Sequence, residues 1–101
     1  MSGVNRNNWR EYSTEPELAI AEQEQANALA ASITAEVLTG SDALVTFIAT
    51  RAKPEQDAYA DARLPRSWAG FPAYVDICRR RDRAEIRAWR EWVELQAKEA
   101  T

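Results

Sequence analysis

The sequence contains no histidine and only one cysteine, Cys78, among its 101 residues. The most common general base, the residue that most often activates serine and cysteine nucleophiles, and the most common metal ligand are therefore missing. A single cysteine also excludes an internal disulfide and any zinc site that needs several cysteines. We therefore expect a non-enzymatic protein with no catalytic residue, no metal and no cofactor.

Glycine, proline and long apolar runs are also scarce. Three glycines, four prolines and an alanine-rich apolar content favour helices over a turn-rich β architecture. No stretch reaches the roughly 18 consecutive apolar residues of a membrane span, and the N-terminus lacks the apolar run of a signal peptide. These features predict a soluble, cytoplasmic protein that does not enter a membrane.

The last third of the chain carries the strongest helical pattern. Ile86, Trp89 and Val93 recur at steps of three and four residues, which places them on one side of a helix. We expect these three side chains to form the centre of the core.

A second apolar stripe, from Phe71 to Cys78, precedes this helix. Asp82 would lie on its buried side if the helix continued, and Asp82 followed by Glu85 also fits a capping box. We therefore expect a kink or break at residues 80–82, with Asp82 as the N-cap of a new helix.

The segment Thr14–Glu15–Pro16–Glu17 predicts the start of the first long helix, because it combines a capping box with proline in the first turn. This helix should run to Leu38 or Thr39 and stop at Gly40. Its apolar side consists of Leu18, Ala26, Leu29, Ala30, Ile33 and Val37.

Glu22 projects into the middle of that apolar side. We expect the first two turns to extend past the core, which leaves Glu22 in water. The alternative is a buried carboxylate paired with an arginine, an arrangement that is costly unless it is well satisfied. Ile20 and Leu38 lie on the opposite side of the helix, either covered by another element or exposed as a contact.

Two shorter helices should follow. Residues 43–50 have β-branched side chains but helical spacing, and no second strand exists for pairing, so we expect a helix that ends before Pro54. Another short helix should run from Pro54 to Arg63. The predicted fold is all-α, a compact single-domain bundle of four to five helices over residues 14–101, preceded by an irregular arm over residues 1–13 that is anchored by Trp9 and Tyr12.

Charge is distributed unevenly along the chain. Residues 1–65 carry 5 Lys and Arg against 10 Asp and Glu, whereas residues 66–90 carry 7 against 3. Runs of carboxylates can meet a basic groove on a partner protein. The acidic side chains that we predict to do so, called the acidic front below, are Glu15, Glu17, Glu22, Glu24, Glu55, Asp57 and Asp61.

The basic segment offers a different surface. If the helix were continuous through Asp82, five arginines would share an arc of about 100°. These residues, called the arginine stripe, are Arg79, Arg80, Arg83, Arg87 and Arg90. The stripe could track a phosphate backbone while Trp68 or Trp92 stacks on bases. We favour a solvated, self-paired face over this reading. The stripe could also be a docking surface for an acidic partner protein or for the acidic front of a second copy of this chain.

No motif names a family. In general character, as a short, acidic-fronted, histidine-free helical domain, the chain is similar to the small accessory proteins of mobile elements, including phage-encoded inhibitors such as anti-CRISPR proteins. We expect a protein-interaction module that binds another protein stoichiometrically, as an inhibitor or adaptor. The alternatives are a nucleic-acid-associated protein that uses the arginine stripe, and a structural subunit of a larger, virion-type assembly with contacts at Ile20, Leu38 and the N-terminal arm. The partner and the oligomeric state stay open.

Overall fold

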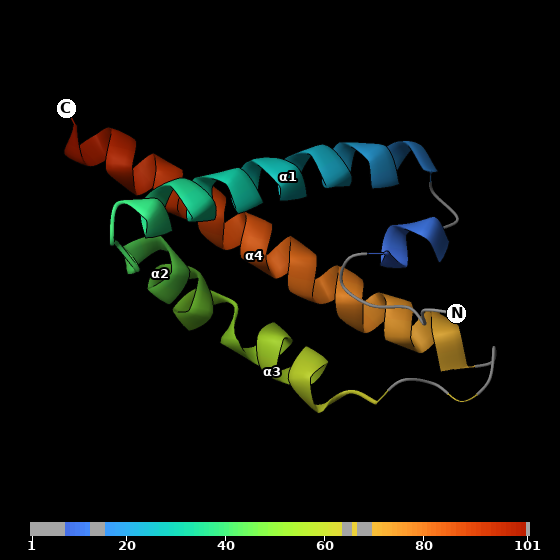
Figure 1. Ribbon diagram of the computed structural model, residues 1–101. Coiled ribbons are helices and arrows are strands. Elements are labelled where there is room, and N and C mark those ends of the chain that lie inside the picture. Colours follow the sequence, from blue (N-terminus) through green and yellow to red (C-terminus); the bar gives the residue numbers. More distant parts are fainter. Residues whose placement is uncertain (1–7, 13–15, 64–65, 67–69, 101) are drawn as a thin grey trace.

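The computed structural model describes residues 8–12, 16–63, 66 and 70–100. These residues form a short 3-10 helix and four α-helices: η1 (Trp9–Tyr12), α1 (Pro16–Leu38), α2 (Ala43–Arg51), α3 (Lys53–Asp61) and α4 (Phe71–Glu99). The part of the chain that is described contains no strand (Figure 1). The predicted all-α bundle is therefore confirmed, with four helices. Thr14, Glu15 and Trp68 lie outside the described residues.

The longest helix, α4, contacts every other described element. It runs through the middle of the molecule in Figure 1, with α1 on one side, α2 and α3 on the other, and η1 beside its N-terminal half. Its 29 residues rise about 1.5 Å each, which accounts for most of the molecule's 51 Å length.

The predicted break at residues 80–82 is wrong, because α4 is continuous from Phe71 to Glu99. Asp82 lies in the middle of the helix and is 6% exposed. Trp9 donates its indole N–H to Asp82 Oδ2 at 2.7 Å, and Arg10 Nη2 lies 3.0 Å from the same oxygen. Asp82, which the sequence predicted as an N-cap, is therefore paired with Trp9 and Arg10 of the N-terminal segment.

The predicted C-terminal end of α1 and the predicted extent of α2 agree with the structure, whereas α3 runs from Lys53 to Asp61 and not from Pro54 to Arg63. The chain stops being helical at Leu38, and Gly40 adopts a φ of +83°. Gly40 N–H donates to the Val37 carbonyl and Ser41 N–H to the Glu36 carbonyl, which is a Schellman motif. Residues 43–51 are helical, as predicted, and α2 ends before Pro54.

The core consists of two clusters of buried side chains. Its main cluster lies where α1 and α2 meet the middle of α4 and comprises Leu29, Leu44, Ile48, Ala52, Ala84, Ile86 and Ala88. A second cluster, around Trp9, Tyr74 and Cys78, fixes η1 against the first half of α4.

Only part of the predicted core stripe on α4 is buried. Ile86 is buried and Trp89 is partly buried, but Val93 is 50% exposed, so its assignment to the core is wrong. The predicted stripe of α1 is also shorter: Leu29 is buried, whereas Leu18 in the first turn and Val37 near the C-terminal end are exposed.

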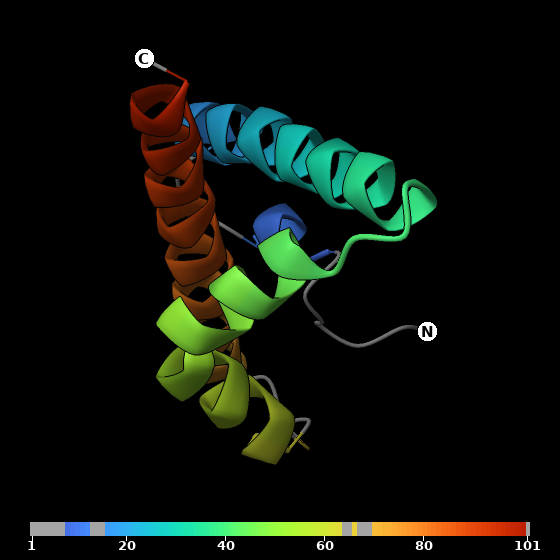
Figure 2. The ribbon, with the colours of Figure 1, turned by 90° about the vertical axis from the view of Figure 1, so that its left-hand side faces the viewer.

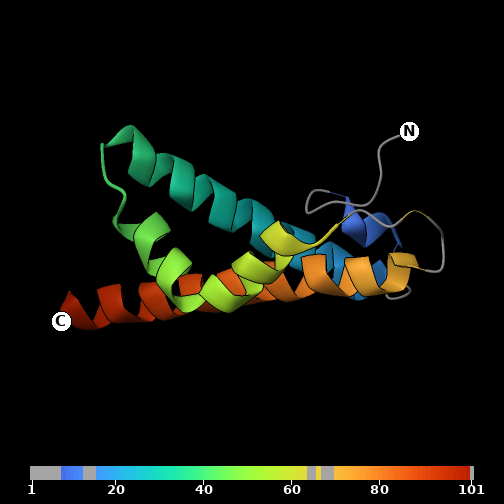
Figure 3. The same cartoon turned by 90° about the horizontal axis from the view of Figure 1, so that it is seen from below.

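The exposure of Val37 and Val93 follows from the angle between the two long helices. Figure 3 shows α1 close to α4 along its N-terminal half and diverging toward its C-terminal end, and Figure 2 shows the same divergence from the side. The chain then returns to α4 through α2, whose Leu44 and Ile48 are buried between the long helices. Packing of α2 therefore keeps the C-terminal halves of α1 and α4 apart.

We predict that Leu44→Ala lowers the free energy of unfolding by about 2–5 kcal/mol, because it leaves a cavity at the junction of three helices. Val45 is the next residue of α2 and is 40% exposed, so Val45→Ala should cost no more than about 1 kcal/mol. Urea denaturation of both variants measures the difference. Equal losses would contradict the assignment of Leu44 to the core.

Candidate functional site

The structure divides the acidic front between two separate helices. Glu17 and Glu24 are exposed on α1, and Asp57 and Asp61 are exposed on α3. Within the described ranges, α1 and α3 make no contact with each other. The front is therefore not one continuous surface. Glu15 lies outside the described residues.

Glu22 faces the interior of the molecule, so the expectation that it lies in water is wrong. It is 7% exposed and accepts two hydrogen bonds, from Arg83 Nε and Nη2, each at 2.9 Å. These bonds lower the pKa of the Glu22 carboxyl from its ordinary 4.5, although burial acts in the opposite direction. Glu22 therefore joins α1 to α4 and is not available to a partner.

The continuous helix α4 does place the arginine stripe on one face, but internal carboxylates occupy most of it. Asp76 forms ion pairs with Arg79 and Arg80, and Glu22 holds Arg83. In the part of the chain that the structure describes, Arg87 and Arg90 are the members of the stripe without an ion pair, and both are exposed. The stripe is thus largely self-neutralised.

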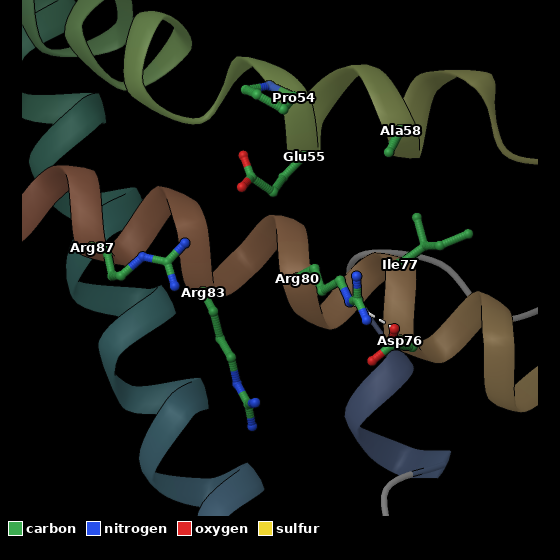
Figure 4. Close-up of a pocket in the computed structure, with 8 residues that line it drawn as sticks. All are labelled: Pro54, Glu55, Ala58, Asp76, Ile77, Arg80, Arg83 and Arg87. Carbon is green, nitrogen blue, oxygen red and sulfur yellow. Dashed lines mark ion pairs between the residues drawn. The ribbon is translucent and has the colours of Figure 1, made fainter.

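A groove of about 560 Å³ runs between α3 and the arginine stripe (Figure 4). Figure 4 shows Glu55 directed toward α4 from the α3 side, Arg80 joined to Asp76, and Arg83 directed away toward α1. Because Glu55 is half-buried against this face, the groove mixes both signs of charge. Mixed charge is unfavourable for a phosphate backbone.

A second groove, of about 550 Å³, lies between the diverging C-terminal halves of α1 and α4. We call it the apolar groove. The α4 wall presents aromatic and aliphatic side chains, the α1 wall presents small and polar ones, and Leu44 of α2 forms part of the lining. The full set is Ser32, Ala35, Glu36, Thr39, Leu44, Trp89, Trp92, Val93 and Gln96.

The apolar groove continues the internal seam between α1 and α4. Ile86, Trp89 and Val93 follow one another on a single side of α4, and exposure rises from 4% at Ile86 to 50% at Val93 as α1 moves away. Trp92 is held in place by an edge-to-face contact with Phe47 of α2, with ring centroids 5.4 Å apart. The aromatic wall is therefore preformed.

Exposed apolar side chains gather around the same end of the molecule. Val37 and Leu38 end α1, Val45 lies in the first turn of α2, and Val93 and Leu95 lie near the end of α4. Figure 1 places these three helix segments at one end. Of these side chains, Val93 lines the apolar groove.

Sequence reasoning did not identify the apolar groove. It counted Trp89 and Val93 as core residues, because periodicity shows which side of a helix is apolar but not where its neighbour stops covering it. The position of Trp92 beside the stripe was the available signal, since it widens the apolar side just where the cover ends.

Residues that carry chemistry are few elsewhere. Cys78 is fully buried, as its place on an apolar stripe predicted; burial and the nearby charge of Asp82 raise the pKa of its thiol to about 11. Among the described residues, no three His, Cys, Asp or Glu side chains come together in a way that could hold a metal ion. None of the described helices combines the length and the apolar character needed to cross a membrane.

Comparisons with models of known protein families, with curated proteins and with solved structures found no match to this chain. Its function therefore has to be inferred from its own residues and their geometry.

We predict that Glu22→Gln lowers the free energy of unfolding at pH 7 by about 1–2 kcal/mol, since it removes a charge-assisted pair whose arginine is partly exposed. The pKa of Glu22 is lowered in the folded protein, so the pair stabilises the fold above pH 4.5. That contribution disappears as the pH falls through the lowered pKa, and the variant and the wild type should then converge.

Glu24→Gln is the matched control, because Glu24 is exposed on the same helix and should show neither effect. Chemical denaturation across the range from neutral to acidic pH checks both variants. A loss at Glu22 that persists unchanged in acid would show that shape, not charge, is responsible.

We predict that Cys78 reacts slowly with iodoacetamide at pH 8 in the folded protein, because the thiol is buried and its raised pKa keeps it protonated. Labelling should become fast in urea. Mass spectrometry of timed samples measures the two rates, and stoichiometric native labelling within minutes would overturn this assignment.

Proposed function

We propose that this chain is a cytoplasmic, non-enzymatic protein-interaction module that acts by stoichiometric binding, as an inhibitor or adaptor, and that the apolar groove is its contact site. The observation that carries the proposal is the preformed wall of Trp89, Trp92 and Val93, which is open to solvent although it continues the core seam. Aromatic residues in well-packed clefts contribute most of the energy of many protein interfaces.

The acidic front has a secondary part in this proposal. Glu17 and Glu24 project from α1, so they can attract a basic partner and speed its encounter without forming the centre of the interface. This arrangement separates two roles: charge guides association, and apolar contact gives residence time.

Nucleic-acid binding is a weaker alternative. Three of the five arginines of the stripe are in ion pairs with Asp76 or Glu22, and the adjoining groove also contains Glu55. A phosphate contact at those positions would first have to break an existing pair.

A subunit of a larger, virion-type assembly is a second candidate, favoured by one observation. Ile20 and Leu38, the contacts expected between copies, are 64% and 82% exposed. They lie eighteen residues apart on the same face of α1, about 27 Å along its axis. Two such isolated contacts give a smaller apolar surface than the groove.

The proposal predicts a discrete partner at the groove. A photo-crosslinking benzophenone residue replaces Gln96, which lines the groove, or Ala60, which is exposed on α3. In native-host extract the Gln96 probe should give one adduct that the Ala60 probe does not. The identified partner, once purified, should form a complex of fixed stoichiometry by light scattering.

Val93→Asp should weaken that complex at least tenfold, because it places a charge in the apolar wall. Its exposure means that the fold should tolerate the change, which circular dichroism checks. Identical adducts from both probe positions would contradict the proposed function. So would a complex whose dissociation constant is unchanged by Val93→Asp.

A further inference from the structure

The charge on the α1 wall restricts what the apolar groove can bind. Residues 11–50 contain seven Asp and Glu but no Lys or Arg. Among those of the seven that the structure describes, Glu22 is the one held by an arginine in a close pair. Glu36 is the charged member of the groove lining, and Asp42 follows it in the turn that leads to α2.

The groove also restricts the backbone conformation of its occupant. Both walls are α-helices, whose backbone N–H and C=O groups are already paired along the helix, so they offer no edge on which a strand could add. A helix brings its own backbone pairs and needs only side-chain contacts. The widening space between two helices is shaped for a third helix, at the usual interaxial distance of about 8–10 Å.

We infer that the occupant of the apolar groove is a basic amphipathic helix of another protein; this inference rests on the proposed function. Its apolar side lies on Trp89, Trp92 and Val93, and its Lys and Arg side chains lie along the α1 wall near Glu36 and toward Asp42. Long basic side chains suit this wall because their aliphatic stems cover Ala35 while their charged ends stay in water.

A second copy of this chain fits the groove less well. The exposed end of α4 would have to enter it, and residues 91–99 carry Glu91, Glu94 and Glu99 against a single Lys98. Pairing two copies would therefore bring acidic helices together. Charge complementarity favours a different, basic protein.

Two synthetic 18-residue peptides test the inference. They share one leucine stripe at positions i, i+3, i+4 and i+7, and all other positions are lysine in one peptide and glutamate in the other. Neither contains tryptophan, so the fluorescence of the full-length protein reports binding. The lysine peptide should bind with 1:1 stoichiometry at least tenfold more tightly than the glutamate peptide, and this preference should shrink as salt is added.

Three variants locate the binding. Val93→Asp should weaken lysine-peptide binding at least tenfold, and Glu36→Lys should reduce the preference for lysine over glutamate. Ile20→Asp is the control, because Ile20 is exposed on α1 but does not line the groove, and it should leave binding unchanged.

Three results would overturn the inference: neither peptide binds, both peptides bind with equal affinity, or Val93→Asp leaves the affinity for the lysine peptide unchanged. A dimer detected by light scattering and abolished by Val93→Asp would instead assign the groove to a second copy. If the peptides fail but the Gln96 crosslink still yields a partner, the proposed function stands and only the basic-helix occupant is rejected. If the crosslink fails as well, both are rejected.

Discussion

The fold depends on α4 meeting every other described element through at least one charged side chain. Asp82 accepts from η1, Arg83 binds α1, Glu85 accepts from Gln56 of α3 at 2.7 Å, and Glu91 pairs with Arg51 of α2. Between these contacts the buried side chains of α4 are Ala84, Ile86 and Ala88. Packing of α2 against this cluster sets the angle between the long helices, and the buried polar contacts add directional restraints on η1, α1 and α3.

The helices themselves were largely predictable, because their signals are local. Gly40 ends α1 by adopting a positive φ, and Pro54 lies in the first turn of α3, directly after the boundary with α2 at Ala52. The errors occurred where a local signal met a distant partner. Asp82 looked like a cap because nothing near it in the sequence indicates that Trp9 will approach, and Glu22 looked solvated because Arg83 lies far along the chain.

The candidate site was less predictable than the fold. Periodicity identified Trp89 and Val93 as one apolar side, but their exposure depends on the angle between α1 and α4, which α2 sets. The acidic and basic segments could be predicted from the distribution of charged residues along the sequence. Whether their side chains are free to contact a partner could not be predicted, because it depends on which carboxylate pairs with which arginine in the folded chain.

The order of the elements has a consequence for synthesis. The helix that contacts every other described element follows all of them in the chain, so η1, α1, α2 and α3 have only their contacts with one another until residues 71–99 have been made. Isolated helices of nine residues are marginal in water, and the apolar side of α1 stays uncovered during that interval. The main core cluster therefore cannot form before α4 has left the ribosome, because Ala84, Ile86 and Ala88 of α4 are part of it.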